Sequence, residues 1–165
     1  MKKGLVLLSV VLLLGSCLKR NDYPNRPNIE FISYTLRTDI AVGGDSIGTV
    51  KFSFTDGDGD LGLNAKDTFG VNAPGQPYHF NLFIRHFQKQ NGVYVEFVAT
   101  NPSFNVRFKN LTPTGRDKTL EGEMDVGIGS QPGSPFDTIR YEMYIVDRAL
   151  QHSDTIVTPD IILPF

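Results

Sequence analysis

The chain of 165 residues contains one cysteine and no tryptophan. A single cysteine excludes an internal disulfide and a zinc site built from several cysteines. The chain also lacks an excess of positive charge, because 18 acidic residues face 16 lysines and arginines. Nucleic-acid-binding proteins normally carry a basic surface, so we expect no nucleic-acid partner. The length is enough for one domain with its own core.

Motifs of several enzyme classes are missing as well. The sequence contains no Gly-x-Ser-x-Gly elbow, no phosphate-binding loop and no dinucleotide-binding glycine pattern. It offers no privileged pair of carboxylates of the kind that a glycosidase places across a cleft. We expect each of the three histidines, His79, His86 and His152, to lie on the surface. The sequence therefore predicts a protein that is not an enzyme.

The one long apolar run lies near the N-terminus. Residues 5–14 are interrupted only by Ser9 and follow Lys2 and Lys3. Ten residues at about 1.5 Å each are too short to cross a hydrocarbon core of roughly 30 Å. A short basic region followed by such a run is typical of a secretory signal peptide. We assign residues 1–16 to a leader that is removed.

The residues that end this run resemble the lipobox of bacterial lipoproteins; they are Leu14, Gly15, Ser16 and Cys17. In that family a signal peptidase cuts before the cysteine, which then carries lipid. The resemblance implies lipidation of Cys17 with several acyl chains, which is enough for stable anchoring in a membrane. A plain signal peptide followed by an incidental cysteine is the alternative.

The lipoprotein resemblance also implies a location in the cell envelope. We expect a lipid anchor in the outer membrane and a body that faces the periplasm or the cell exterior. Residues 17–28 are polar and contain Pro24 and Pro27, which favours an extended, lipidated tether. The folded body is then residues 29–165.

In this body, apolar and polar residues alternate as they do in half-buried β-strands. Eight segments carry the pattern: 29–36, 50–54, 80–87, 93–97, 104–108, 120–128, 139–145 and 156–163. Asn91-Gly92 predicts a two-residue hairpin turn, and Pro159 places the last segment at a sheet edge. The segment 80–87 is apolar on both faces, which indicates a central strand. We predict an all-β fold, an antiparallel β-sandwich of about seven to eight strands.

Two motifs make the body resemble an immunoglobulin-like domain. The penultimate strand of that family is matched by Asp137, Ile139, Tyr141 and Met143. Met143 stands where antibody-type domains keep a cysteine. Residues 147–154 are similar to a turn of bacterial immunoglobulin-like and cadherin-like domains, with Leu150 and Gln151 in place of Gly and Asn. The resemblance implies that the Tyr141 hydroxyl bonds to upstream backbone; a plain core tyrosine is the alternative.

An acidic loop follows Phe54. It reads Thr55-Asp56-Gly57-Asp58-Gly59-Asp60-Leu61-Gly62 and places a carboxylate at every second residue. Glycine lets the backbone curl so that these side chains converge, and Ca²⁺ takes six to eight oxygen ligands. A weak Ca²⁺ site, with a dissociation constant of about 10⁻⁴–10⁻³ M, is one interpretation of the pattern. A metal-free series of Asp-Gly turns is the alternative, because aspartate readily bonds to its own backbone.

The spacing resembles the start of calcium loops such as those of the EF-hand, dockerin and thrombospondin type 3 repeats. A similar stretch occurs in secreted Bacteroidetes-type lipoproteins. Leu61 breaks the EF-hand pattern and a strand precedes the loop, so an EF-hand is excluded. The loop resemblance adds Gly62 and Asp67 as ligands, and an immunoglobulin-like topology brings Asp147 and Asp154 to the same end of the body. The candidate metal ligands are Asp56, Asp58, Asp60, Gly62, Asp67, Asp147 and Asp154.

These observations predict a cell-envelope lipoprotein whose body is a binding or structural module with a Ca²⁺ site. Its expected partners are the membrane, through lipid on Cys17, and a protein or glycan ligand. Two alternatives stay open. One is a glycan-binding accessory protein, which needs an exposed aromatic platform, and the other is a fimbrial or assembly subunit that exchanges strands at a sheet edge. We expect Phe69 and Tyr78, in and just after the long loop 64–77, to cap one end of the sandwich.

Overall fold

The computed structural model describes residues 22–39, 45–99, 103–129 and 135–164. The leader expected at residues 1–16 and the expected lipidation site Cys17 lie outside these ranges. Within them the chain forms β-strands and one short 3-10 helix, η2 (Gly70–Asn72). None of the helical structure in these ranges is long and apolar enough to cross a membrane.

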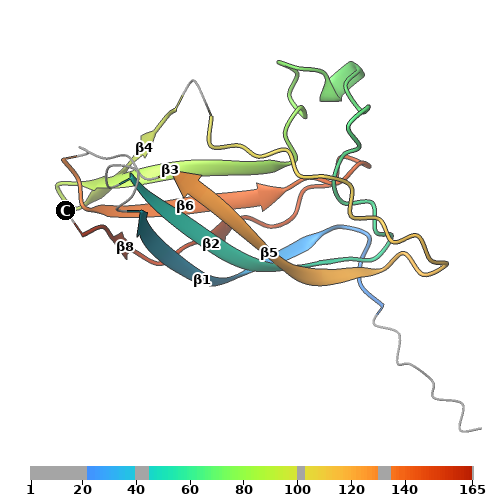
Figure 1. The fold of residues 1–165 in the computed structure, drawn as a ribbon, viewed down its shortest axis with the longest axis horizontal. Helices are drawn as coiled ribbons and strands as arrows, with labels where there is room; N and C mark the ends of the chain where they lie inside the picture. Colours follow the sequence, from blue (N-terminus) through green and yellow to red (C-terminus); the bar gives the residue numbers. More distant parts are fainter. Residues whose placement is uncertain (1–21, 40–44, 100–102, 130–134, 165) are drawn as a thin grey trace, which may run out of the picture.

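The strands form two antiparallel sheets that pack face to face (Figure 1). The first sheet has the order β1-β2-β5 and consists of β1 (Asn28–Asp39), β2 (Asp45–Asp56) and β5 (Leu120–Gly129). The second has the order β4-β3-β6-β7, with β8 also on β6, and consists of β3 (Leu82–Gln90), β4 (Val93–Phe97), β6 (Thr138–Ile145), β7 (Ile156–Val157) and β8 (Ile161–Ile162). The predicted all-β sandwich is confirmed.

The strand order is that of an immunoglobulin-like sandwich, in which the first, second and fifth strands face the third, sixth and seventh. The fourth strand joins the first sheet in antibody constant domains, whereas β4 pairs here with β3. This arrangement places β3 between β4 and β6, which confirms the predicted central position of a segment that is apolar on both faces.

Alternation along each strand builds the core. Phe52 of β2 lies opposite Met124 of β5, and Val50 lies opposite Val126, so the same face of both strands turns inward. From the other sheet, β6 contributes its alternate residues, among them the fully buried Met143. Each fully buried apolar side chain of this size stabilises the fold by about 1.5–3 kcal/mol.

Two predicted strands differ in the structure. The prediction of a strand at 104–108 is wrong. Val106 forms an isolated bridge with Leu82 through backbone hydrogen bonds in both directions, but side chains take the neighbouring positions of a ladder. The Asn81 amide donates to and accepts from the backbone of Phe108, and Asn105 Oδ1 accepts the Ile84 amide. The predicted last strand is divided into β7 and β8 on either side of Pro159, since proline cannot donate to a ladder.

The expectation that His86 lies on the surface is wrong. His86 is 4% exposed and faces the core from β3, as Ile84 does, with the rings of Phe97, Phe104 and Tyr141 around it. Neither ring nitrogen has a hydrogen-bond partner in the described part of the chain. Loss of water lowers the pKa of His86 from 6.5 to about 4. The strand alternation carried the signal, since His86 follows Ile84 by two residues.

Tyr141 is likewise a core residue. It is almost completely buried in β6, and its ring packs against Tyr34 of the facing sheet at 6.4 Å between centroids. Burial raises the pKa of its hydroxyl. These contacts are those of the plain core tyrosine that was the alternative to a tyrosine corner.

The buried His86 predicts a specific pH dependence of stability. Its pKa is about 4 in the folded chain and 6.5 when unfolded, so the folded chain binds fewer protons between these values. The stability it contributes is therefore complete above about pH 6.5 and is lost as the pH falls toward 4, by up to about 3 kcal/mol. The His86→Phe variant should gain stability over the wild type as the pH falls, measured by urea unfolding at several pH values. A His79→Gln control should follow the wild type, and an unchanged pH dependence in His86→Phe would contradict the assignment.

Candidate metal site

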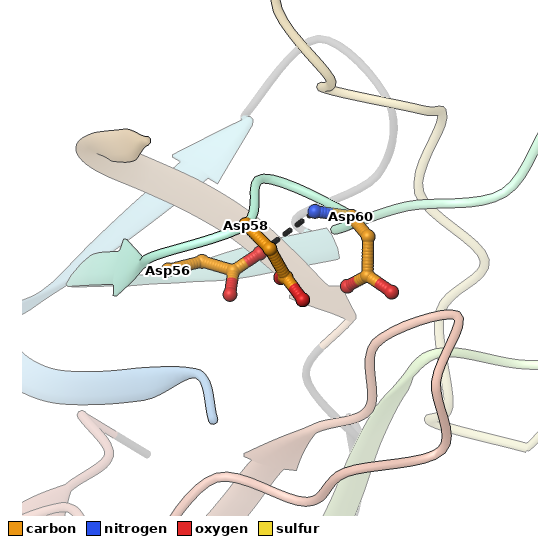
Figure 2. A group of neighbouring side chains, drawn as sticks. All are labelled: Asp56, Asp58 and Asp60. Atoms are coloured by element: carbon orange, nitrogen blue, oxygen red, sulfur yellow. Dashed lines mark hydrogen bonds between the residues drawn. The ribbon is translucent and has the colours of Figure 1, made fainter. Parts of the chain in front are cut away.

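The acidic loop begins at the last residue of β2. Asp56 ends the strand, and Asp58 and Asp60 follow in the loop. One carboxylate oxygen from each of the three lies within 4.8 Å of the others. Figure 2 shows the three side chains turned toward one common space from successive positions of the loop. The structure thus brings these three candidate ligands together.

Glycines make this curl sterically feasible. Gly59 has a φ of +65°, and a Cβ atom at this position would lie 1.7 Å from the carbonyl oxygen of Lys118. A Cβ atom on Gly57 would lie 2.2 Å from the carbonyl oxygen of Tyr23. The loop is therefore packed against two other segments of the backbone, and only glycine fits between the aspartates.

The carboxylates of the loop are not satisfied by hydrogen bonds. Asp56 is fully buried, and its Oδ2 accepts the Asp60 amide at 2.9 Å. Its Oδ1 has no partner among the described residues, and the same holds for the buried Oδ1 atoms of Asp58 and Asp60. A self-contained Asp-Gly turn accounts for the Asp56 Oδ2 bond but leaves three buried oxygens without a donor. Such atoms carry the full cost of lost hydration.

Burial and mutual repulsion disfavour the ionised cluster. Burial, followed by the charges of Asp58 and Asp60, raises the pKa of Asp56 to about 7. Burial and the charge of Asp58 also raise the pKa of Asp60, although Arg148 opposes the shift. Both groups would hold their charge more readily beside a bound cation.

A fourth carboxylate comes from the loop between β6 and β7. Ala149 N donates to Asp60 Oδ2 at 3.0 Å, so this loop lies against the acidic loop, as the topology predicts. Asp147 is 4% exposed; its Oδ1 accepts the Gln151 amide at 2.7 Å, and its Oδ2 is buried without a partner among the described residues. Its charge contributes to the raised pKa of Asp56. Asp147 therefore lies near the cluster, although only Asp56, Asp58 and Asp60 have carboxylate oxygens within 4.8 Å of one another.

The carbonyl oxygen of Gly62, which was a candidate metal ligand, accepts a hydrogen bond from Arg148 instead. The Arg148 guanidinium donates to the carbonyls of Leu61 and Gly62 and to the side chains of Asn110 and Thr112, at 2.6–3.3 Å. In the part of the chain that the structure covers, Arg148 forms no ion pair with the acidic cluster. It joins the two loops without neutralising the carboxylates, a role that sequence reasoning missed.

The other two candidate ligands are also bonded elsewhere. Asp67 Oδ2 accepts the backbone and side-chain N–H groups of Asn64, at 2.7 and 2.8 Å. Asp154 is exposed, and its Oδ1 pairs with Arg26 Nη2 at 2.6 Å. The structure does not bring Asp67 or Asp154 into the cluster, which leaves four carboxylates from two loops.

The loop that carries Asp147 contains a strained residue. Leu150 has a φ of +64°, which places a leucine in the left-handed region that glycine or asparagine adopts more readily. Leu150 stands where the resembling turns have glycine. A leucine in this conformation carries a backbone cost of about 1–2 kcal/mol.

Relief of this strain is testable. Leu150 is 39% exposed, so a smaller polar residue sacrifices little burial. Because asparagine tolerates a positive φ, Leu150→Asn should raise the free energy of unfolding by about 0.5–1 kcal/mol. Chemical denaturation measures the change, and Ala149→Asn in the neighbouring position should bring no such gain. A loss of stability in Leu150→Asn would show that leucine packing outweighs the strain.

Aromatic rings line the outer face of the second sheet beside this loop. Phe83 stacks on Tyr144 at 4.9 Å and Tyr144 on His152 at 5.3 Å, with Tyr78 edge-on to Phe83. The stacked rings cover one another's faces. The expectation that Phe69 caps the sandwich is wrong, because this side chain is 73% exposed. Stacking between β3 and β6 requires knowledge of their register, which the sequence pattern alone did not supply.

The fold and the site define an immunoglobulin-like β-sandwich with a cluster of three aspartates at one end and a fourth, Asp147, beside it. No family model, curated protein or solved structure matches the chain. The functional conclusion therefore depends on the geometry of the cluster and on the N-terminal sequence.

Proposed function

We propose that the protein is a cell-envelope lipoprotein whose sandwich binds Ca²⁺ at Asp56, Asp58, Asp60 and Asp147, as a binding or structural module. One observation carries the metal site. Each of the four residues has a buried carboxylate oxygen without a hydrogen-bond partner among the described residues. The lipid anchor is supported by the leader and the lipobox-like residues that end in Cys17.

The chemistry of the donor atoms favours calcium over other common metals. The cluster offers only carboxylate oxygens, and neither histidine nor cysteine is part of it. Hard oxygen donors suit Ca²⁺ and Mg²⁺, whereas zinc and copper prefer nitrogen and sulfur. Calcium accepts irregular sets of six to eight oxygens at 2.3–2.6 Å, while Mg²⁺ requires a compact octahedron. Four carboxylates from two loops fit the first requirement better.

Hydrogen bonds already join the two loops, and a bound cation would offset the repulsion among their carboxylates. A ligand that binds only the folded chain stabilises it by about 2.7 kcal/mol at a concentration of 100 times its dissociation constant. The gain in stability is therefore the direct readout of the site, and it does not depend on knowing the protein's partner.

Replacement of the buried Asp56 distinguishes a Ca²⁺ site from a metal-free series of Asp-Gly turns. In Asp56→Asn, the amide oxygen can still accept the Asp60 amide, so the turn is retained. Without metal the variant should be at least as stable as the wild type, because a buried uncompensated charge is removed. In about 5 mM calcium the wild type should melt several degrees higher than in chelator, and the variant should lose most of this shift.

An outer-face variant serves as the control for charge. Asp125→Asn removes an aspartate that pairs with Lys51 on the outer face of β5, and it should keep the calcium shift. Magnesium at the same concentration should raise the melting temperature less than calcium. A wild-type protein that melts at the same temperature in calcium and in chelator would leave the metal-free turn as the explanation.

The geometry favours the two alternative functions less. Phe83 and Tyr144 stack on each other instead of offering a flat platform to a sugar ring. For an assembly subunit, β1 does offer a sheet edge, because it pairs with β2 alone in the described part of the sheet. A bulge between Phe31 and Ser33 interrupts this edge, however, and bulges protect edges from further pairing.

A further inference from the structure

The segment that precedes β1 is part of the cluster's surroundings. Residues 23–27 were expected to belong to a free tether, but they lie against the acidic loop. The carbonyl oxygen of Pro24 accepts the Gly57 amide at 2.8 Å, and the Tyr23 hydroxyl donates to Glu121 at 2.7 Å. Pro27 is completely buried. The folded body therefore begins several residues before β1.

The same segment contacts the second loop of the cluster. Arg26 Nε donates to the carbonyl oxygen of His152 at 2.7 Å, and its Nη2 pairs with Asp154. The Gln151 side chain donates to the carbonyl oxygen of Asn25 at 3.4 Å. Figure 1 shows the N-terminal segment entering at the end of the sandwich where β2 and β6 also finish. Residues 23–27 thus bridge the two loops that carry the aspartates.

Two residues, Gly57 and Gln151, contact both the segment and the part of the chain that carries the carboxylates. Gly57, which bonds to Pro24, stands between Asp56 and Asp58 in the chain. The backbone amide of Gln151 holds Asp147 Oδ1, while its side chain holds the N-terminal segment. The segment is therefore attached to both loops, at Gly57 and at Gln151. A change in the distance between the two loops changes the distance between these two attachments.

We infer that the cation bound at the aspartate cluster holds residues 23–27 against the body, and that its loss releases them. With the cation present, both loops are drawn to one centre and the bridge fits. Without it, the repulsion among the aspartates works against the hydrogen bonds that join the two loops, and the loops hold the segment less firmly. The cation site is then a switch for the connection between the body and whatever precedes it in the chain. This inference rests on the proposed Ca²⁺ site.

Release lengthens the tether. Residues 23–27 add five residues, or about 17 Å of extended chain, between the body and Cys17. If Cys17 carries lipid as proposed, the local calcium concentration sets the distance and the freedom of the body relative to the membrane. The docked segment keeps the acidic end of the sandwich close to the anchor, and the released segment lets the body turn.

Backbone dynamics of the full chain test this directly. The probe is calcium alone, with chelator as the reference, and the readout is the heteronuclear ¹⁵N nuclear Overhauser effect of the Tyr23, Asn25 and Arg26 amides. In calcium these amides should be as rigid as those of β3. In chelator they should become mobile while the β3 amides stay unchanged.

A reciprocal measurement uses Arg26→Ala, which cuts the bridge to the second loop without touching an aspartate of the cluster. Because coupling between two events is reciprocal, calcium should bind this variant about fivefold or more weakly in titration calorimetry. Loss of a positive charge would by itself strengthen cation binding, so a weaker affinity can only reflect the lost bridge. The control Arg85→Ala removes an exposed arginine from the outer face of β3 and should bind calcium as the wild type does.

The outcomes separate this inference from the proposed site. Unchanged amide dynamics and unchanged affinity of Arg26→Ala, with calcium bound by the wild type, would overturn the switch and leave the metal site standing. Absence of calcium binding to the wild type would overturn both. Mobile amides in chelator that become rigid in calcium, with weaker binding by Arg26→Ala, would establish the switch.

Discussion

The repulsion between the buried Asp56 and its less buried neighbours Asp58 and Asp60 is the constraint on which the rest of this site depends. Two like charges whose oxygens are no more than 4.8 Å apart repel by about 3–4 kcal/mol or more at the effective dielectric constant of a protein surface. The fold could relieve this energy by turning the side chains outward or by placing a basic residue among them. The side chains do not turn outward, and the Arg148 charge offsets the repulsion only in part, because its guanidinium donates to carbonyls and neutral side chains. A cation bound among the carboxylates, as proposed above, would offset this repulsion.

Several further costs gather at this end of the sandwich. A leucine adopts the left-handed conformation in the loop of Asp147, and glycines in the acidic loop press against the backbone of Tyr23 and Lys118. The core between the two sheets, by contrast, shows ordinary alternation along the strands and ordinary packing of apolar side chains. Concentrated strain and unsatisfied polar atoms are expected where a fold serves a function instead of its own stability. The N-terminal segment, docked across the same end, shares in this arrangement.

The sequence predicts the layers and the three-aspartate convergence because both follow from local periods: alternation in the strands and glycine spacing in the loop. The expected immunoglobulin-like topology added Asp147 to the candidate ligands, because no local sequence pattern indicates it. The remaining differences come from partners that are distant in sequence. The Asn81 side chain takes the place of a strand ladder beside Phe108, and Arg26 forms an ion pair with Asp154. Residues 23–27 pack against the body although their composition is that of a linker. The prediction that His86 lies on the surface is wrong because it follows from the residue type, whereas the position of His86 in the strand pattern indicates burial.

A crystal structure of the protein grown in calcium, with anomalous diffraction data, tests the central claim most directly. The account predicts an anomalous peak bounded by the free oxygens of Asp56, Asp58, Asp60 and Asp147, at 2.3–2.6 Å from the carboxylates that bind it. Residues 23–27 should be ordered in the same crystal. Carboxylates that point apart around ordinary water, with no peak at millimolar calcium, would contradict the claim.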